Sequence, residues 1–266
     1  MTDLPTTAFD NGHAPATRPR RIAVVPAYNE EATVRAVLEG LYEHVDELIV
    51  VDDGSTDDTA GVIDAWLPGH ERARRLGFAQ NRGMSAAYYL AFTDLRARLN
   101  EGDIDARDLV FTVDADGQHD LAALDMLERV THDTGLDALL ARRDLSNYPP
   151  HKRLGNWVMS AWASIWAGHR LLDVESGFRI FRLGALADAL DYYRGYQYSE
   201  TIEVAVVLCR LGYAVRNDVV VPVPIYRSRT RLFDVAVDLV MAPVAAARVR
   251  AGRRRRVRAA RPRQHD

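Results

Sequence analysis

Short apolar runs that alternate with helical patterns constrain the fold of this chain more than any other feature of its sequence. Residues 21–25, which are apolar after Arg21, and residues 48–51 are brief runs of the kind expected for buried strands. Between them, apolar residues recur at the spacing of an amphipathic helix, at Val34, Val37, Leu38 and Leu41. Strands that alternate with helices build a parallel sheet. We therefore predict an α/β fold with a mixed, mostly parallel sheet flanked by helices.

The same patterns predict the other elements. We expect the first strand to end at Pro26, which has no N–H to donate, and the next helix to open at residues 29–31, where acidic side chains favour its dipole. Further strands are predicted over 76–80, 109–113, 138–141 and 214–223. A second helix is predicted to end near residue 66. Further helices are predicted over 85–99, 121–132, 156–167, 199–211 and 232–249.

Length and composition limit the class of protein. With 266 residues, 48% of them hydrophobic, the chain can bury one large core or two small ones. No apolar run approaches the ~20 residues that span a bilayer. Residues 1–19 are polar, which predicts a disordered leader rather than a secretory signal. The single cysteine, Cys209, excludes an internal disulfide and fits a reducing compartment, so we expect a cytoplasmic protein.

The charge is unevenly distributed along the chain. Seven Arg and one Asp from Ala251 to the C-terminus give this segment a charge of +6, which leaves −9 on residues 1–250. Such a basic tail either binds an anionic membrane surface or stays solvated. The absence of aromatic residues among the arginines argues against nucleic acid as a partner.

Two carboxylates follow the apolar run at 109–113. Asp114 and Asp116 are separated by one residue, so in an extended chain both side chains point to the same side. Like charges this close repel each other unless a cation lies beside them. Mg²⁺ and Mn²⁺ prefer such oxygen ligands and often bridge to the phosphates of a substrate. The alternative interpretation is structural: the pair ends a strand and caps the helix that follows.

Five motifs occur in an order and spacing that carry a family resemblance. They are residues 24–31 (VVPAYNEE), 51–57 (VDDGSTD), 81–83 (NRG), 114–119 (DADGQH) and 176–179 (SGFR). The series resembles the family 2 glycosyltransferases of the GT-A fold, in particular the polyprenyl-phosphate, or dolichyl-phosphate, mannose and glucose synthases. The resemblance implies a Rossmann-like nucleotide-sugar transferase domain with a C-terminal extension. The implied division is a nucleotide-sugar half (20–120), an acceptor half (121–232), a C-terminal helix (233–250) and a basic tail (251–266).

The resemblance also implies roles for the residues that match these motifs. The donor would be a nucleotide-diphosphate sugar of the GDP-mannose or UDP-glucose type, and Asp53 would accept a hydrogen bond from its base. The implied nucleotide-binding residues are Pro26, Tyr28, Glu30, Asp53 and Asp114. A Mg²⁺ or Mn²⁺ ion that binds the diphosphate would be held by Asp114, Asp116 and Gln118. The cation neutralises charge that develops on the leaving group.

Arginines lie in segments that, in similar enzymes, face the acceptor phosphate or the donor diphosphate. A guanidinium group suits this role because it binds phosphate oxygens bidentately. We expect Arg179 to act in catalysis with Asp114 and Asp116, since an unpaired charge in its apolar setting would be costly. The expected acceptor or phosphate-binding residues are Arg142, Arg153, Arg179, Arg227, Arg229 and Arg231.

The acceptor decides whether the reaction needs a general base. A polyprenyl phosphate is mostly dianionic at neutral pH and is already a nucleophile, whereas a sugar hydroxyl needs a carboxylate within hydrogen-bond reach. Many relatives that use a hydroxyl carry an adjacent acidic pair at the start of a helix, but residues 198–203 have the sequence YSETIE. We therefore expect a metal-dependent transfer of a hexose to polyprenyl phosphate, by one in-line displacement with inversion.

Two departures from the family pattern keep alternatives open. Met84 stands where the family commonly has Lys, and the loop after Tyr226 is short and lacks its usual glycine. The alternatives are transfer to a soluble or glycan hydroxyl, and a non-catalytic nucleotide-binding module. A lipid acceptor would place the enzyme at the inner face of the membrane, held by the basic tail and by the helix at 156–167. That helix contains Trp157, Trp162 and Trp166, and its alternative role is a core helix.

Overall fold

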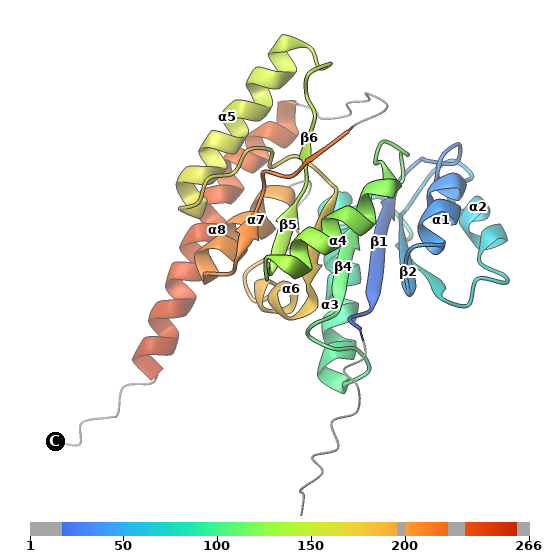
Figure 1. Ribbon diagram of the computed structural model, residues 1–266, viewed down its shortest axis with the longest axis horizontal. Helices are drawn as coiled ribbons and strands as arrows, with labels where there is room; N and C mark the ends of the chain where they lie inside the picture. Colours follow the sequence, from blue (N-terminus) through green and yellow to red (C-terminus); the bar gives the residue numbers. More distant parts are fainter. Residues whose placement is uncertain (1–17, 196–199, 223–231, 260–266) are drawn as a thin grey trace, which may run out of the picture.

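The computed structural model describes residues 18–195, 200–222 and 232–259 (Figure 1). Seven strands form one sheet in the order β3-β2-β1-β4-β7-β5-β8. Its parallel part consists of β1 (Arg21–Ala27), β2 (Glu47–Asp53), β3 (Ala73–Phe78) and β4 (Leu109–Thr112). In the other part, β7 (Arg179–Arg182) is antiparallel to its two neighbours, β4 and β5 (Ala138–Leu140). The last strand, β8 (Val215–Arg216), is parallel to β5. The predicted mixed, mostly parallel sheet is confirmed.

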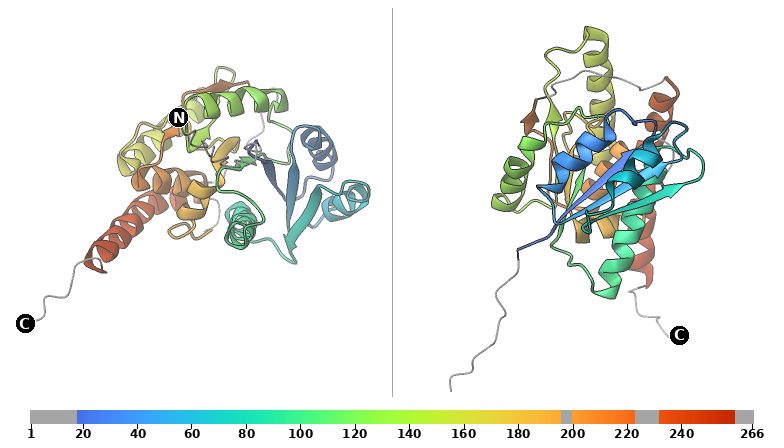
Figure 2. Two further views of the ribbon diagram at one scale, coloured as in Figure 1. Left: turned by 60° about the horizontal axis from the view of Figure 1, so that its bottom comes forward. Right: turned by 90° about the vertical axis from the view of Figure 1, so that its right-hand side faces the viewer.

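Helices cover both faces of this sheet (Figure 2). One face packs against α1 (Val34–Tyr42), α2 (Thr59–Trp66) and α4 (Leu124–Asp133), the last preceded by the short turn η1 (Leu121–Ala123). The other face packs against α3 (Met84–Glu101), α6 (Leu183–Ala189) and α7 (Glu200–Leu211). Successive residues of β1 enter these two cores in turn, since side chains alternate across a strand.

Two long helices lie side by side on the opposite side of the molecule from α1 and α2 (Figure 1). They are α5 (Pro150–Ala167) and α8 (Leu232–Ala259), and the Trp162 indole N–H donates to the Leu239 carbonyl at 3.0 Å. A small parallel pair, β6 (Arg142–Arg143) and β9 (Val220–Val221), lies at the start of this region. Among the described residues, no helix is both long and apolar enough to cross a bilayer.

The first strand does not end at Pro26, as the sequence predicted, but continues to Ala27. The Val24 carbonyl accepts a hydrogen bond from Val113, so the backbone polar groups of residues 24 and 26 face β4. β4 pairs no further than Thr112 opposite Val24. The missing N–H of Pro26 therefore removes no ladder hydrogen bond.

The first helix begins at Val34, so the prediction that residues 29–31 open it, with acidic side chains in its first turn, is wrong. Asn29 has a left-handed φ of 54°, which excludes a helix start there. The loop instead binds the turn after β2: Asn29 Oδ1 accepts from the Thr56 amide at 2.8 Å, and the Glu30 amide donates to Thr59 Oγ1 at 2.8 Å.

Other boundaries also differ from the predictions. The strand expected over 214–223 is two short strands in different sheets, and between them buried Asn217 bonds to the backbone of residues 140, 172 and 173. α5 begins earlier, at Pro150, a residue suited to a helix start. α8 ends at Ala259 rather than at 249 or 250, because Ala and Arg favour helix. Of the expected leader, only Arg18 and Pro19 are described.

Candidate functional site

The predicted nucleotide and metal residues lie at one edge of the sheet. β1, β2 and β4 are parallel neighbours, so the loops that follow them leave the sheet at the same end. Tyr28 follows β1, Asp53 ends β2, and Asp114 and Asp116 follow β4. In open α/β sheets this edge is where ligands bind.

Asp114 is fixed by neighbours from two segments. Its Oδ2 lies 3.0 Å from His119 Nε2, and the His119 ring packs against Phe178 with ring centres 5.0 Å apart. Burial by itself raises the pKa of Asp114, but the hydrogen bond and charge of His119 and the charge of Arg179 outweigh burial and lower it. The second oxygen, Oδ1, is buried and has no hydrogen-bond partner within the described residues. Asp114 therefore has one buried carboxylate oxygen that no described residue satisfies.

Asp116 lies in the same loop, but its pKa is shifted in the opposite direction. Burial, and then the negative charge of Asp114, raise its pKa. Gln118 donates to it twice, through its backbone amide at 3.0 Å and through its side-chain nitrogen. A cation between the two aspartates would relieve their repulsion, and the hard oxygen donors suit Mg²⁺ or Mn²⁺.

These residues fit a divalent ion only with help from a ligand. Nowhere in the described parts of the chain do three His, Cys, Asp or Glu side chains come together to enclose a metal. The side chain of Gln118 also turns its nitrogen, not its oxygen, toward Asp116. Mg²⁺ is commonly bound by one or two carboxylates together with substrate phosphates and water. The site is therefore one that a diphosphate would complete.

Asp53 connects two of the sequence motifs. Its buried carboxylate accepts from the Arg82 and Gly83 amides, both at 2.8 Å, and from Asn81 Nδ2 at 3.0 Å. Burial raises its pKa, against the effect of these bonds. The motif at 81–83 is thus held in place by Asp53, a role that its sequence did not suggest. A contact with a nucleotide base stays a prediction.

The other predicted nucleotide residues surround this edge. Pro26 and Glu30 are buried, whereas Tyr28 between them is exposed. Tyr28 therefore offers an aromatic face that a base or ribose could contact.

Arg179 is buried at the start of β7 and forms an ion pair that the sequence did not predict. Its Nη1 donates to Glu200 Oε1 at 2.8 Å, and its Nε donates to the Ser176 carbonyl at 2.7 Å. Both side chains are only 2% exposed. Burial raises the pKa of Glu200 to about 7, with Arg179 opposing this and Asp114 adding to it. Tyr88 lies in the same group, since burial and the charges of Asp114 and Glu200 raise its pKa.

Several polar atoms around Asp114 lack partners. Within the described residues, these buried atoms without a hydrogen bond include Asp114 Oδ1, Ser176 Oγ, Arg179 Nη2 and Glu200 Oε2. An unpaired buried polar atom costs about 1–3 kcal/mol. A group of donors and acceptors of this kind is suited to a polar ligand that brings both.

The predicted acceptor arginines fall into three groups. Arg142 on β6 and Arg153 on α5 are exposed, whereas Arg179 is buried. The remaining three, Arg227, Arg229 and Arg231, lie outside the described residues.

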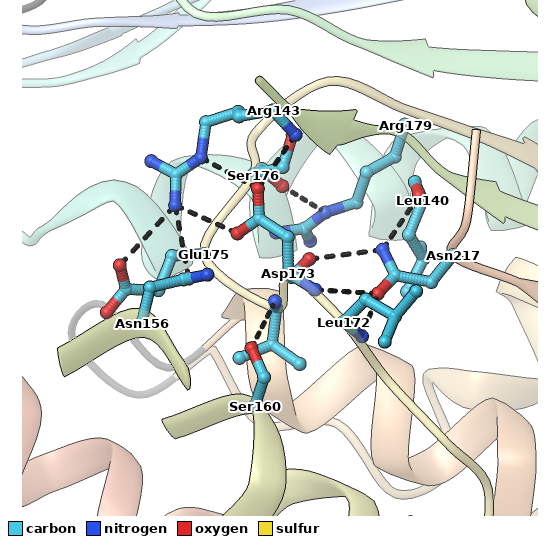
Figure 3. Close-up of polar contacts among 11 residues, drawn as sticks. Leu140, Arg143, Asn156, Ser160, Leu172, Asp173, Glu175, Ser176, Arg179 and Asn217 are labelled. Atoms are coloured by element: carbon cyan, nitrogen blue, oxygen red, sulfur yellow. Dashed lines mark hydrogen bonds and ion pairs between the residues drawn. The ribbon is translucent and has the colours of Figure 1, made fainter. Parts of the chain in front are cut away.

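Arg143, which sequence analysis missed, is the centre of a buried network (Figure 3). Its Nε and Nη2 donate to the two Asp173 oxygens, both at 2.9 Å, and Nη2 lies 3.3 Å from Asn156 Oδ1 and 3.4 Å from Glu175 Oε2. Asn217 donates to the Asp173 carbonyl and to the Leu140 carbonyl. The network joins α5 and β5 to the loop that leads to Gly177.

Comparisons with known proteins show which family this chain belongs to. The family described as "Glycosyl transferase family 2" matches residues 22–186. The chain is 27% identical over 207 residues to the UDP-N-acetylglucosamine–dolichyl-phosphate N-acetylglucosaminyltransferase of Methanococcus voltae. The aligned region covers 70% of this chain and 78% of that protein. It is 30% identical over 189 residues to the polyprenol monophosphomannose synthase of Mycolicibacterium smegmatis, covering 64% and 66%.

Solved structures agree on the fold. Glucosyl-3-phosphoglycerate synthase from Mycobacterium tuberculosis, in complex with Mn²⁺ and UDP-glucose, superposes with a TM-score of 0.62 at 19% identity, over 87% of this chain and 79% of that one. At this identity the likeness concerns the GT-A fold alone. The family match covers more than half of the chain. The protein therefore belongs to glycosyl transferase family 2.

Proposed function

We propose that this glycosyltransferase moves a hexose from a nucleotide-diphosphate sugar to a polyprenyl phosphate, with inversion at the sugar carbon. The observation that carries the proposal is the position of Asp114 and Asp116 at the sheet edge that Tyr28 and Asp53 share. The relatives named above act on dolichyl phosphate or polyprenol, which supports the acceptor.

Asp114 and Asp116 are the residues that would hold Mg²⁺ or Mn²⁺, with Gln118 beside them. When bound, the ion supplies positive charge to the leaving diphosphate. The synthase of the same fold that was crystallised with Mn²⁺ and UDP-glucose is an example of this donor chemistry on the fold. Tyr28, Pro26, Glu30 and Asp53 would line the nucleotide pocket.

The unpartnered polar atoms behind Asp114 suit the hydroxyl groups of the donor sugar. A hydroxyl both donates and accepts, so it can satisfy Arg179 Nη2 and Glu200 Oε2 together. Arg179 is 2% exposed and therefore out of reach of an acceptor phosphate at the surface. We assign it to the donor, and exposed Arg142 and Arg153 to the acceptor phosphate.

The burial and the arginine partners of Glu200 and Glu203, the two glutamates on α7, support a phosphate acceptor. Glu203 is fully buried and its carboxylate is bound by Arg248 of α8, so it is not placed to take a proton from a hydroxyl. Glu200 is paired with Arg179. A phosphate dianion needs neither, because it attacks without losing a proton.

Transfer to a soluble hydroxyl is the second candidate, and the pKa of Glu200, raised to about 7, favours it. A carboxylate with that pKa is matched to general-base work near neutral pH, but Glu200 would have to leave Arg179 to reach a hydroxyl. The two candidates differ in which product forms and in whether Glu200 carries a proton.

A donor panel tests the proposal. The protein is incubated with Mn²⁺, polyprenyl phosphate and one of GDP-mannose, UDP-glucose or UDP-N-acetylglucosamine, and the lipid fraction is analysed by mass spectrometry. One donor should yield a glycosylated lipid. Asp116→Asn should slow its formation about 10²-fold or more, and Asp133→Asn, an exposed carboxylate on α4, should not. Sugar found only on water-soluble acceptors would favour the second candidate, and no transfer from any donor would refute the first.

A further inference from the structure

The outward face of α5 is apolar, although a surface helix normally turns polar residues outward. The inward face is buried and consists of Asn156, Met159, Ser160, Ala163 and Ala167. The large outward side chains are between 45% and 65% exposed and are Leu154, Trp157, Val158 and Ile165. The tryptophans are thus divided: Trp157 faces outward, whereas Trp162 and Trp166 are half-buried against the core.

α8 extends this apolar surface. Leu239 and Val240 are 38% and 60% exposed, and the bond from Trp162 to the Leu239 carbonyl joins the two helices at this point. We call these six side chains the apolar platform: Leu154, Trp157, Val158, Ile165, Leu239 and Val240. The other large apolar residues of comparable exposure in the described chain are Tyr28, Met126 and Val220, which lie in three separate segments. Clustered exposure of this kind marks an interaction surface.

The charges around the platform select its partner. α5 contains no Asp or Glu, and its first turn carries His151, Lys152 and Arg153. α8 contains no acidic residue from Val240 to Ala259, and Arg250 and Arg253 on it are exposed. α8 carries Asp234 and Asp238 ahead of Leu239, so only α5 is free of carboxylates along its whole length. Two copies of the chain facing each other through α5 would therefore bring no α5 carboxylate to these cations. An anionic lipid surface offers both negative headgroups and an apolar layer.

The inward face of α5 is joined to the loop at residues 173–176 (Figure 3). Asn156 accepts from Arg143, and Ser160 Oγ accepts from the Val174 amide at 3.3 Å. The loop continues directly to Gly177, which lies against Asp114. The helix that carries the platform therefore also positions the site.

We propose that the apolar platform is the docking surface for an anionic phospholipid bilayer. This inference deepens the proposed function, on which it rests, because a polyprenyl phosphate stays in the membrane and must be met there. Leu154, Trp157, Val158 and Ile165 insert among the headgroups, and the basic residues at both ends of the platform contact the phosphates.

Vesicle flotation tests this surface without any polyprenyl phosphate present, so its result does not depend on the transfer reaction. The full chain is mixed with vesicles of pure phosphatidylcholine, or of phosphatidylcholine and phosphatidylglycerol in equal parts. The chain should float with the anionic vesicles and only weakly with the neutral ones. Trp157→Ser together with Ile165→Ser should lower the partition constant about tenfold or more. Met126→Ser, an exposed apolar residue on α4, is the matched control and should bind as the wild type does.

Brominated lipids give an independent readout. They should quench tryptophan fluorescence in the wild type, and Trp157→Phe should remove most of that quenching. Absence of binding to anionic vesicles, or equal binding by the double variant, would overturn the inference. So would a dimer of the wild type that the double variant converts to a monomer. If detergent-dispersed polyprenyl phosphate is still glycosylated in any of these cases, the proposed function holds and only the docking surface is refuted.

Discussion

Gly177 allows the loop before β7 to pass directly against Asp114. A Cβ at position 177 would lie 2.4 Å from Asp114 Oδ2 and 2.7 Å from Oδ1. Neither side can easily move, because Asp114 is held by His119 and the Gly177 carbonyl accepts from Thr112 Oγ1 at 2.6 Å. The glycine of this motif is therefore required by space at the carboxylate.

Replacing Gly177 with Ala should displace the Asp114 carboxylate and weaken catalysis. A misplacement of about 1 Å in such a site can cost 10²-fold in rate, so kcat/KM for the active donor should fall by about that factor. Gly155→Ala is the matched control, since a Cβ there would meet nothing within 4 Å. Wild-type kcat/KM in Gly177→Ala, measured on protein of unchanged thermal stability, would show that Asp114 need not keep this position.

At the scale of elements, α8 is a structural part of the molecule rather than a loose extension. Met241, Ala242, Ala245 and Val249 are buried. Arg248 contacts the buried carboxylate of Glu203 on α7 and the Tyr192 carbonyl, and Arg253 donates to the Leu211 carbonyl at 2.8 Å. The last contact also places a cation at the C-terminal end of α7, where the helix dipole favours it.

Removing Arg248 should destabilise the fold through Glu203. Breaking an ion pair whose carboxylate is fully buried costs about 3–5 kcal/mol, and the lower end applies because Arg248 is 31% exposed. Urea unfolding of Arg248→Ala should show this loss, and Arg250→Ala, exposed two residues further on, should not. Glu203→Gln in the Arg248→Ala background should recover part of the stability. Equal stability of the two single variants would contradict the role of Arg248 as an anchor.

Across the whole molecule, the sequence predicts what is local and misses what depends on distant contacts. The apolar runs before Asp53 and Asp114 predict buried parallel strands and hence the common edge where both lie. β7 is missed because Arg179 and Arg182 occupy both ends of a four-residue strand. The pairing of Arg179 with Glu200, 21 residues apart, arises only when β7 and α7 pack together. The spacing of the tryptophans likewise could not tell which face of α5 is outward, because α8 covers one side of it.

The incomplete ligand set at Asp114 and Asp116 predicts that metal and nucleotide bind as one unit. Mn²⁺ alone would have only two carboxylates as protein ligands, and a nucleoside diphosphate alone would be repelled by their negative charge. Neither should therefore raise the melting temperature much. Together they should do so, since binding at 100 times Kd stabilises by about 2.7 kcal/mol, or roughly 5–10 °C for a chain of this size. GDP and UDP are each tested with Mn²⁺, and EDTA should reverse the shift. Asp116→Asn should abolish it, whereas Asp133→Asn should keep it. A full shift by either nucleotide in EDTA would mean that the diphosphate is bound without a cation, and the assignment of both aspartates would then be wrong.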